Sequence, residues 1–439
     1  MSRNQSRREF LKSSTAFAGC AILPSAARAF SPNEKLRTVH VGVGGKGRSD
    51  LSSMASHAGV EVAALCDVDS KTLAKQSELH PKAKLFRDYR EMISSLADTI
   101  DAVLVSTPDH THAPAAMTAF NHGKPVYCQK PLTHEVFEAR QLRLVSEKKG
   151  LVTQMGIQAS ATLHYRRAVE LIRVGEIGKV HSVVAWSYKN WGYDGPAFDV
   201  EHEIPESLDW NLWLGVAGAR RYVEKVYHPG QWRKQVDFGT GTLGDMGVHI
   251  FDTPYRALEL TAPRFAETTC RKPTGIGHPE SNKVYYEFPG TKYTTDTLKW
   301  TWYDGQLAVP MIESDNLPPD LKLPRQGSMF LGEAGNLLLP HVGEPQIFRE
   351  GARSPRKFDL EPRNHYHEWV DACMGNGKTS SPFSYGSPLT EALLLGVVAN
   401  RFPGQRLEWD PKNLKVTNLE EASKLIRRPP REGFEVAGL

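Results

Sequence analysis

The chain has 439 residues, of which 40% are hydrophobic and 24% are charged, a composition typical of a globular protein with two or three domains. The net charge is only +4 and the basic residues are dispersed, so charge gives no support to nucleic-acid binding. No apolar run reaches the roughly 18 residues that a membrane-spanning helix needs, so we expect no membrane span.

The first 29 residues have the pattern of an export signal rather than of a folded segment. Residues 6–12, SRREFLK, match the twin-arginine consensus, an apolar stretch follows at 16–23, and residues 27–29 are Ala-Arg-Ala. We expect cleavage after residue 29 and export of the folded protein to the periplasm by the twin-arginine machinery. A loose lipoprotein pattern ending at Cys20 is an alternative that the short apolar run before it disfavours.

From residue 34 to 157, strand and helix patterns alternate along the chain. The expected strands are 38–43, 60–66, 84–86, 101–106, 125–128 and 151–155, and the expected helices are 47–57, 70–78, 88–96, 112–122 and 134–149. This alternation predicts an α/β class domain, a doubly wound Rossmann sheet of parallel strands.

A glycine-rich turn follows the first expected strand and opens the first helix. Gly42, Gly44 and Gly47 have the spacing of a dinucleotide site, in which they allow a tight turn, close approach of a pyrophosphate and close helix packing. Free N–H groups at the start of the helix would bind the phosphates. Asp67 ends the second strand 20 residues after Gly47, where an acid binds the adenosine ribose. A carboxylate there repels the 2′-phosphate of NADP, so we expect NAD. Three nearby cations keep NADP possible: Lys46, Arg48 and Lys71.

Ligands of doubly wound sheets bind at the carboxyl ends of the strands, so the residues after each strand are candidate cofactor contacts. They are Gly42, Gly44, Gly45, Lys46, Gly47, Arg48, Asp67, Thr107, Pro108, His110, Gln129, Lys130 and Gln158. His110 and His112 lie two residues apart, but nothing nearby completes a metal-ligand set. We expect them to cap the helix and to line the cofactor pocket, and we expect no metal centre. The cysteines beyond the signal are widely spaced and predict buried free thiols.

Residues 158–439 have a different pattern and predict a second, α+β domain. A helix at 162–174, a strand at 179–190, a tryptophan-rich loop and a helix at 242–260 come first. Strands follow at 264–272, 282–288, 293–302, 327–331 and 336–339, then helices at 363–374 and 387–399. Consecutive strands joined by turns predict a large, open, mostly antiparallel sheet. We expect the last helices to pack back on the first domain, and the tail, 403–439, to wrap a surface.

Three residues could carry proton and hydride chemistry. Lys130 follows the fifth strand, where Pro131 keeps it extended, and its ammonium could polarise a substrate hydroxyl beside a nicotinamide. Asp245 and His249 are four residues apart in an expected helix and therefore share a face. A histidine can take a hydroxyl proton as hydride leaves, and the aspartate can hold a substrate hydroxyl or orient the imidazole. A structural, core-facing His249 is the alternative.

Aromatic side chains near the tryptophan-rich loop could stack on sugar rings, although many of them would equally suit a core. Trp191 and Trp232 are the candidates there, and Tyr165 is a further candidate substrate contact. Arg233 could hold a substrate oxygen.

Several stretches together resemble the Gfo/Idh/MocA family of glucose–fructose oxidoreductase and inositol dehydrogenase, in particular its exported twin-arginine branch. They are VGVGGKGR, ALCDVD, STPDHTHAPAA, GKPVYCQKPLTH, DWNLWLG, HPGQWRK, FGTGTLGDMGVHIFD, HEWVDAC and PLTEALLLG. The resemblance implies that Lys130 contacts nicotinamide and substrate, that Asp245 and His249 complete the catalytic set, and that the protein is a homo-oligomer. Gln129 departs from the family pattern, which has glutamate there, and this changes how the charge of Lys130 is balanced.

We therefore expect an NAD(P)-dependent oxidoreductase that transfers hydride between nicotinamide and a secondary hydroxyl of a sugar, polyol or glycoside. Export favours tight binding of the nucleotide, because the periplasm holds no free nicotinamide pool. One alternative is NAD-dependent glycoside cleavage by transient ring oxidation and elimination. A non-catalytic binding protein with a structural nucleotide is a further alternative, against which the intact Lys130 and His249 argue.

Overall fold

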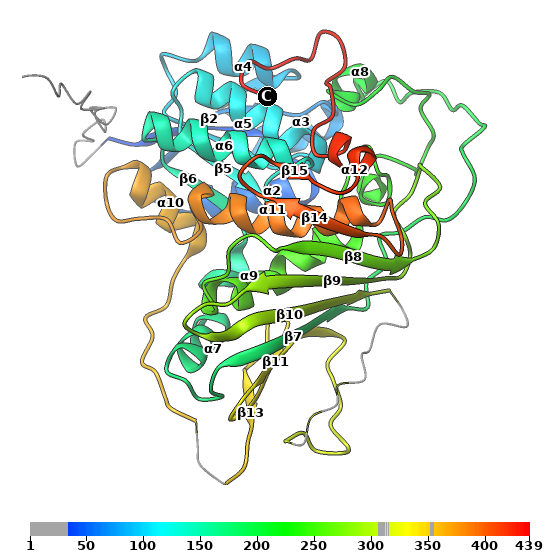
Figure 1. Ribbon diagram of the computed structural model, residues 1–439. Helices are drawn as coiled ribbons and strands as arrows, with labels where there is room; N and C mark the ends of the chain where they lie inside the picture. Colours follow the sequence, from blue (N-terminus) through cyan, green and yellow to red (C-terminus); the bar gives the residue numbers. More distant parts are fainter. Residues whose placement is uncertain (1–33, 306–311, 313, 315, 352–354) are drawn as a thin grey trace, which may run out of the picture.

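The structure, a computed structural model, describes residues 34–305, 312, 314, 316–351 and 355–439. The expected export signal and Cys20 lie outside the described residues. Figure 1 shows two layers, a Rossmann layer in blue and cyan above a larger sheet in green to orange. Within the part of the chain described here, no helix has the length and apolar character to span a membrane.

The first layer is a six-stranded parallel sheet with the strand order β3-β2-β1-β4-β5-β6. Its strands are β1 Leu36–Val41, β2 Val60–Cys66, β3 Lys84–Phe86, β4 Ala102–Val105, β5 Val126–Gln129 and β6 Thr153–Gly156. The central strands β4 and β5 are buried along their whole length, as expected for short apolar strands with helices on both faces. This order reverses between β1 and β4, which is where a doubly wound sheet binds its ligand.

Five helices connect these strands. They are α2 Gly45–Ala55, α3 Ser70–Leu79, α4 Tyr89–Ser95, α5 Asp109–Asn121 and α6 Val136–Lys149. The largest difference from expectation is in α5, which begins at Asp109, three residues before the expected start. His110 and His112 are therefore inside the helix and do not cap it.

The second layer is a nine-stranded sheet with the order β13-β12-β11-β7-β10-β9-β8-β14-β15. Its strands are β7 Val180–Ser187, β8 Phe265–Cys270, β9 Asn282–Pro289, β10 Thr294–Asp304, β11 Gln326–Gly332, β12 Gly335–Pro340, β13 Gln346–Phe348, β14 Arg406–Asp410 and β15 Lys415–Val416. Among the strands in the described residues, only β7 and β10 of this sheet pair in parallel, so the sheet is mixed and mostly antiparallel, which confirms the expected fold class. Three of its strands, β13 to β15, were not predicted, because two of them have only two or three residues.

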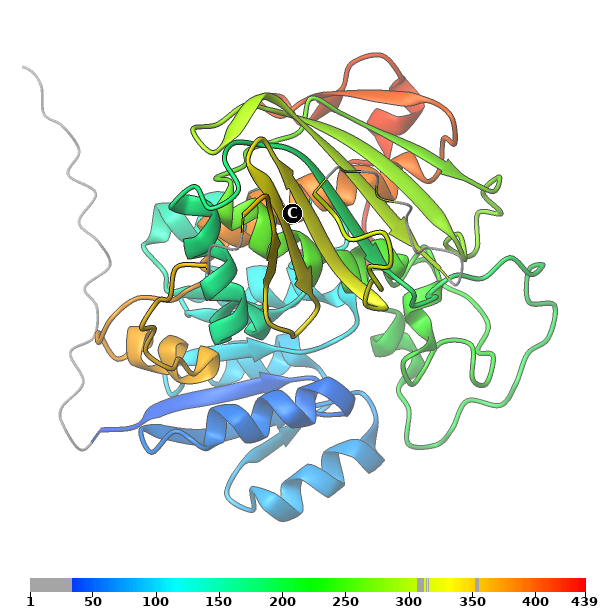
Figure 2. The ribbon, with the colours of Figure 1, turned by 90° about the horizontal axis from the view of Figure 1, so that it is seen from below.

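The longer helices of the second domain are α7 Leu163–Arg173, α9 Val248–Ala257, α10 His365–Cys373 and α11 Phe383–Ala399. Helix α9 packs on β7 and β11 of the second sheet, whereas α10 packs on α2 of the Rossmann layer. The apolar helix α11 lies between α6 and the second sheet, as Figure 1 shows. Figure 2 shows the connecting segment, residues 188–240 (green), extending along one side of both layers, with the short helix α8 Trp210–Leu214 within it. The tail forms α12 Glu420–Lys424 and returns to the Rossmann layer, where Asn121 donates to the Ala437 carbonyl.

Candidate active site

A cavity of about 940 Å³ lies where the two layers and the connecting segment meet. At one end it is lined by Gly44, Gly45 and Asp67, and at the other by Lys130 and Arg233. The cavity thus extends along the carboxyl edge of the sheet, from the end of β2, past the end of β1, to the end of β5. This is the course that a dinucleotide takes across a Rossmann sheet.

The glycine turn leaves room for a pyrophosphate above the start of α2. Gly44 is the N-cap residue of α2, no side chain caps this helix end, and Gly44 and Gly45 both line the cavity. The first N–H groups of α2 are thus without intrahelical partners, and they provide the usual site for an anion. Gly42 has a φ of +79°, and a Cβ on Gly47 would come within 2.0 Å of the Gly42 carbonyl oxygen. Gly42 and Gly47 are therefore required by the turn itself, whereas Gly44 and Gly45 are available to a ligand.

Asp67 stands at the adenosine end of the cavity. Its Oδ2 accepts the N–H of Val43 at 2.9 Å and its Oδ1 accepts the N–H of Asp69 at 3.0 Å. Burial raises the pKa of Asp67 above its ordinary value, while these two N–H groups act in the opposite direction. The carboxylate is thus fixed beside the glycine turn with capacity for further donors, such as ribose hydroxyls. The residues at this end fit NAD.

The connecting segment closes the adenosine end by bonding to the backbone that follows β2. The N–H of Ser70 donates to the Ser207 carbonyl at 2.8 Å, and the N–H of Asp209 donates to the Val68 carbonyl at 2.9 Å. Arg87 Nη2 donates to both carbonyls, at 2.6 Å to Val68 and 2.9 Å to Ser207. A ligand at this end is consequently covered by a segment from the second domain.

At the other end, Lys130 and Asp245 join the two layers through a buried ion pair. Lys130 Nζ lies 2.7 Å from Asp245 Oδ1 and donates to the Asp245 carbonyl at 3.0 Å. Arg233 Nε donates to the same Oδ1 at 3.2 Å, and Trp191 Nε1 donates to Oδ2 at 2.8 Å. Burial would raise the pKa of Asp245, but Lys130 and Arg233 outweigh it and hold that pKa well below its ordinary value. Asp245 is therefore an anion, and a substrate hydroxyl would have to share it with, or displace, one of these donors.

Asp245 and His249 lie on one continuous helical segment, as predicted, but its first part is not α-helical. Residues Leu243–Gly247 form a π-helical turn that runs directly into α9. Such turns are rare and often mark functional sites. A Cβ on Gly244 would come within 1.9 Å of Thr240 Oγ1, so this turn requires glycine there.

His249 lies beyond Asp245 and does not line the cavity. It is half-buried, and its Nδ1 is buried without a hydrogen-bond partner among the described residues. Its ring centroid is 5.6 Å from that of His341, whose Nδ1 is 2.6 Å from the Tyr165 hydroxyl. Burial, Lys130 and His341 lower the pKa of His249 well below 6.5. The imidazole is therefore neutral, which is the form that accepts a proton.

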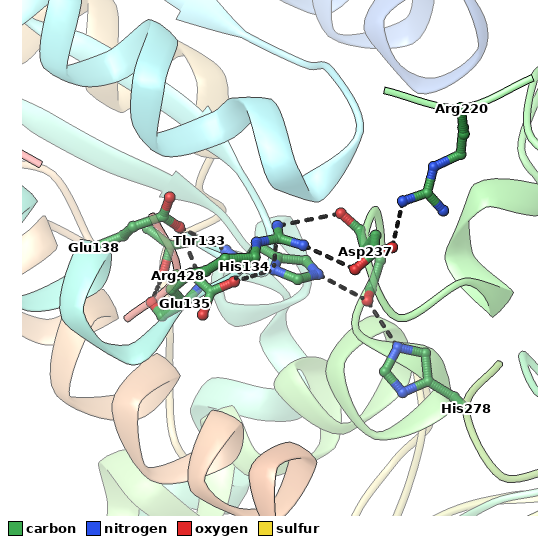
Figure 3. Close-up of polar contacts among 9 residues, drawn as sticks. Thr133, His134, Glu135, Glu138, Arg220, Asp237, His278 and Arg428 are labelled. Carbon is green, nitrogen blue, oxygen red and sulfur yellow. Dashed lines mark hydrogen bonds and ion pairs between the residues drawn. The ribbon is translucent and has the colours of Figure 1, made fainter. Parts of the chain in front are cut away.

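The loop that precedes the π-helical turn is held by a polar cluster, shown in Figure 3. The Gly239 carbonyl accepts from His278 Nε2 at 2.8 Å and from His134 Nε2 at 3.2 Å. Arg428, from the C-terminal tail, donates to Asp237 Oδ1 at 3.1 Å and to its carbonyl at 3.2 Å. The tail thus fixes the loop that positions Asp245.

Several expected cofactor contacts are placed elsewhere. Arg48 is exposed on the outer side of α2 and does not line the cavity. His110 is buried, with its Nε2 3.1 Å from the Trp213 carbonyl, and does not line the cavity either. His112 bonds the Thr107 and Pro131 carbonyls at 2.9 and 2.8 Å, so it ties together the loops after β4 and β5. Gln158 does not line the cavity; with its amide oxygen turned toward Lys46 it would accept from Lys46 Nζ at 3.2 Å and donate to the Gly156 carbonyl at 2.8 Å.

The remaining candidates are close to where the sequence placed them. Thr107, Pro108, Gln129, Trp232 and Arg233 line the cavity. Tyr165 is instead buried against His341, and Trp191 is joined to Asp245. Sequence reasoning did not find His341, Asp50 or Tyr366. Of these, only Asp50 gave a usable signal, because it lies four residues after Lys46 on one helix face.

Comparison with known families matches the Rossmann layer and the first part of the second domain. A model described as an oxidoreductase family, NAD-binding Rossmann fold, matches residues 36–157, and one described as an oxidoreductase family, C-terminal alpha/beta domain, matches residues 176–259. Inositol 2-dehydrogenase of Corynebacterium glutamicum (strain R) is 28% identical over 152 residues, 34% of this chain and 44% of the relative. Inositol 2-dehydrogenase of Salmonella typhimurium is 30% identical over 142 residues, 32% and 42% of the two chains. Glycosyl hydrolase family 109 protein 1 of Shewanella sp. (strain ANA-3) is 29% identical over 170 residues, 36% of each.

Solved structures share the fold at low sequence identity. The WlbA dehydrogenase from Bordetella pertussis, solved with NADH and UDP-GlcNAcA, has a TM-score of 0.62 at 14% identity, covering 86% of this chain and 99% of that one. The aldose–aldose oxidoreductase from Caulobacter crescentus, solved with glycerol, has a TM-score of 0.60 at 16% identity, covering 86% and 100%. This chain spans less than half the length of the curated relatives it matches. Both domain models of the Gfo/Idh/MocA oxidoreductase family thus match this chain in order, the NAD-binding Rossmann domain at residues 36–157 and the C-terminal domain at residues 176–259.

Proposed function

We propose that this protein is an NAD-dependent oxidoreductase that acts on a secondary hydroxyl of a sugar, polyol or glycoside. The observation that carries the proposal is the joining of Lys130, from the cofactor domain, to Asp245, from the second domain, with a neutral His249 one helical turn away. A cation thus lines the end of the dinucleotide cavity where a nicotinamide would lie, with an anion beside it and a base one helical turn further on. Bound NAD would supply the hydride acceptor.

Each of the three side chains has a distinct part in this proposal. The Lys130 ammonium polarises the substrate C–O bond. Asp245 accepts a hydrogen bond from a substrate hydroxyl in place of Arg233, whose bond to it at 3.2 Å is the longest of its side-chain contacts. His249 accepts the hydroxyl proton as the carbon is oxidised, and returns it in the reverse reaction. The ring of His341 packs near that of His249, and the Tyr165 hydroxyl holds His341.

Retention of the nucleotide and export form a second part of the proposal. The hydrogen bonds of Ser207 and Asp209 across the adenosine end must open before a bound dinucleotide can leave. We propose that NAD is taken up before export by the twin-arginine route and is retained in the periplasm. Asp67 favours NAD over NADP, and Lys46 is engaged by Asp50 rather than by the adenosine end of the cavity. Homo-oligomer formation stays a prediction.

The test is to mix the purified protein, with its bound nucleotide identified by mass spectrometry, with a panel of cyclitols, aldoses, uronates and glycosides. Reduced nicotinamide should appear with at least one of them, and the His249→Ala variant should not produce it although it retains NAD. Failure of the whole panel with NAD-loaded protein would contradict the proposal. Glycoside cleavage is not favoured by the inositol dehydrogenase relatives, and aglycone release without net change in nicotinamide would revive it.

A further inference from the structure

A second buried carboxylate, Asp50, lies next to the nicotinamide end of the cavity. Its side chain is 1% exposed and accepts four hydrogen bonds. Oδ1 accepts from Lys46 Nζ at 2.5 Å and from the Tyr366 hydroxyl at 2.8 Å. Oδ2 accepts from Ser106 Oγ and from Gln129 Nε2, both at 2.9 Å.

These four donors come from separate parts of the fold. Lys46 and Asp50 are one turn apart on α2, Ser106 follows β4, Gln129 ends β5, and Tyr366 is on α10. Asp50 therefore fastens the glycine turn, two neighbouring strand ends and a C-terminal helix together. Hydrogen bonds from this many donors offset the cost of burying the carboxylate.

The side chain of Gln129 connects Asp50 to the backbone of Lys130. Its amide nitrogen is used by Asp50, so its Oε1 faces the other way and accepts the N–H of Lys130 at 3.2 Å. Gln129 is 4% exposed and lines the cavity. An amide can donate on one side and accept on the other, whereas a carboxylate can only accept. A glutamate here would place two anions at hydrogen-bond distance.

The two lysines at this end consequently have separate carboxylates. Lys46 is paired with Asp50, and Lys130 is paired with Asp245. We propose that Asp50 is the positioning residue for this wall of the site: it supplies the negative charge that residue 129 lacks, and it sets the amide orientation that holds Lys130. This inference rests on the proposed function, because it assigns Asp50 a part in shaping the nicotinamide site.

The central test is a reciprocal exchange of charge between residues 50 and 129. Gln129→Glu should place two carboxylates side by side, which raises the pKa at which the pair loses its shared proton. Above that pKa the two charges repel, so the thermal midpoint of the variant should fall relative to the parent. At lower pH the carboxylates share one proton and the midpoint should recover. Asp50→Asn with Gln129→Glu restores one anion and reverses the donor and acceptor, so its midpoint should follow the parent at every pH. A purely packing role for Asp50 predicts no such pH-dependent loss and rescue.

The second measurement is the affinity of each variant for NAD, which does not require catalytic turnover. Asp50→Asn and Gln129→Glu should each weaken NAD binding by about tenfold, and the exchange variant should recover it to within about threefold. Asp101→Asn is the control, because the Asp101 side chain is also largely buried, with an exposure of 8%, and pairs with Arg37 away from the cavity. It should lower stability without weakening NAD binding.

The outcomes separate this inference from the proposed function. If the parent binds no NAD, the proposed function fails, and the pH profile of Gln129→Glu still decides whether the carboxylate of Asp50 acts as described. A parent-like pH profile for Gln129→Glu, or a folded exchange variant without rescue, would overturn the inference. Should Gln129→Glu not fold, Gln129→Met should weaken NAD binding about tenfold and Tyr366→Phe less than threefold. Equal effects of these two variants would likewise overturn it.

Discussion

The ion pair between Lys130 and Asp245 should couple the two domains energetically. Both side chains are almost buried, with exposures of 13% and 11%. Removing one partner of a buried pair costs about 3–5 kcal/mol, because the other charge is left uncompensated. Asp245→Asn should lower the free energy of unfolding by about 3 kcal/mol, the low end of this range, because Lys130 still donates to the carbonyl of residue 245. Lys130→Met should cost about 2 kcal/mol, since Arg233 and Trp191 still bond Asp245.

The assay is a double-mutant cycle on the free energy of unfolding in urea. The double variant should lose less free energy of unfolding than the two single variants lose together, and the difference, the coupling energy, should be about 2 kcal/mol. The exposed pair Arg264–Glu287 has a similar separation of 2.9 Å and serves as a control, for which the coupling should stay below about 1 kcal/mol. Equal coupling in the two cycles would refute the argument from burial.

Three further predictions follow from individual carboxylates and from the imidazole. Asp67→Ser should reduce the preference for NAD over NADP by at least about tenfold, measured as the two dissociation constants, because like-charge repulsion of the 2′-phosphate is removed. His249 has a pKa well below 6.5, so kcat/KM should stay level as the pH falls through 6.5, and an acid limb at that value would contradict the buried environment. Asp304 Oδ1 has no hydrogen-bond partner among the residues that the structure describes, and burial raises the pKa of Asp304 from 3.8 to about 8, so the folded state holds a proton that the unfolded chain loses. Asp304→Asn should therefore stabilise the protein by up to about 4 kcal/mol near pH 7 and by almost nothing near pH 4, and an equal gain at both pH values would refute this assignment.

The sequence predicted the parts of the site that depend on regular structure. Alternating strands and helices place the residues after β1, β2 and β5 at one edge of a sheet, so Gly44, Asp67 and Lys130 could be assigned to one cavity. Helical spacing also placed Asp245 and His249 on one face, although the π-helical turn before His249 has no signal in hydrophobic periodicity.

The parts that could not be predicted depend on contacts between distant segments. Tyr366 reaches Asp50 across 316 residues, and Ser207 reaches Ser70 across the domain boundary. No local pattern encodes such pairs. His110 shows the converse case: it follows a strand like the true site residues, but the helix begins early and turns its ring into the core.

The most direct test of the central claim is a single-turnover experiment on protein that carries its own NAD. On mixing with a reactive sugar or polyol, the absorbance of reduced nicotinamide should rise to about one equivalent per bound NAD, and Lys130→Met and His249→Ala should abolish the rise while retaining the nucleotide. If either variant with bound NAD reduced it as fast as the parent does, hydride transfer would not depend on these residues and the account would be wrong.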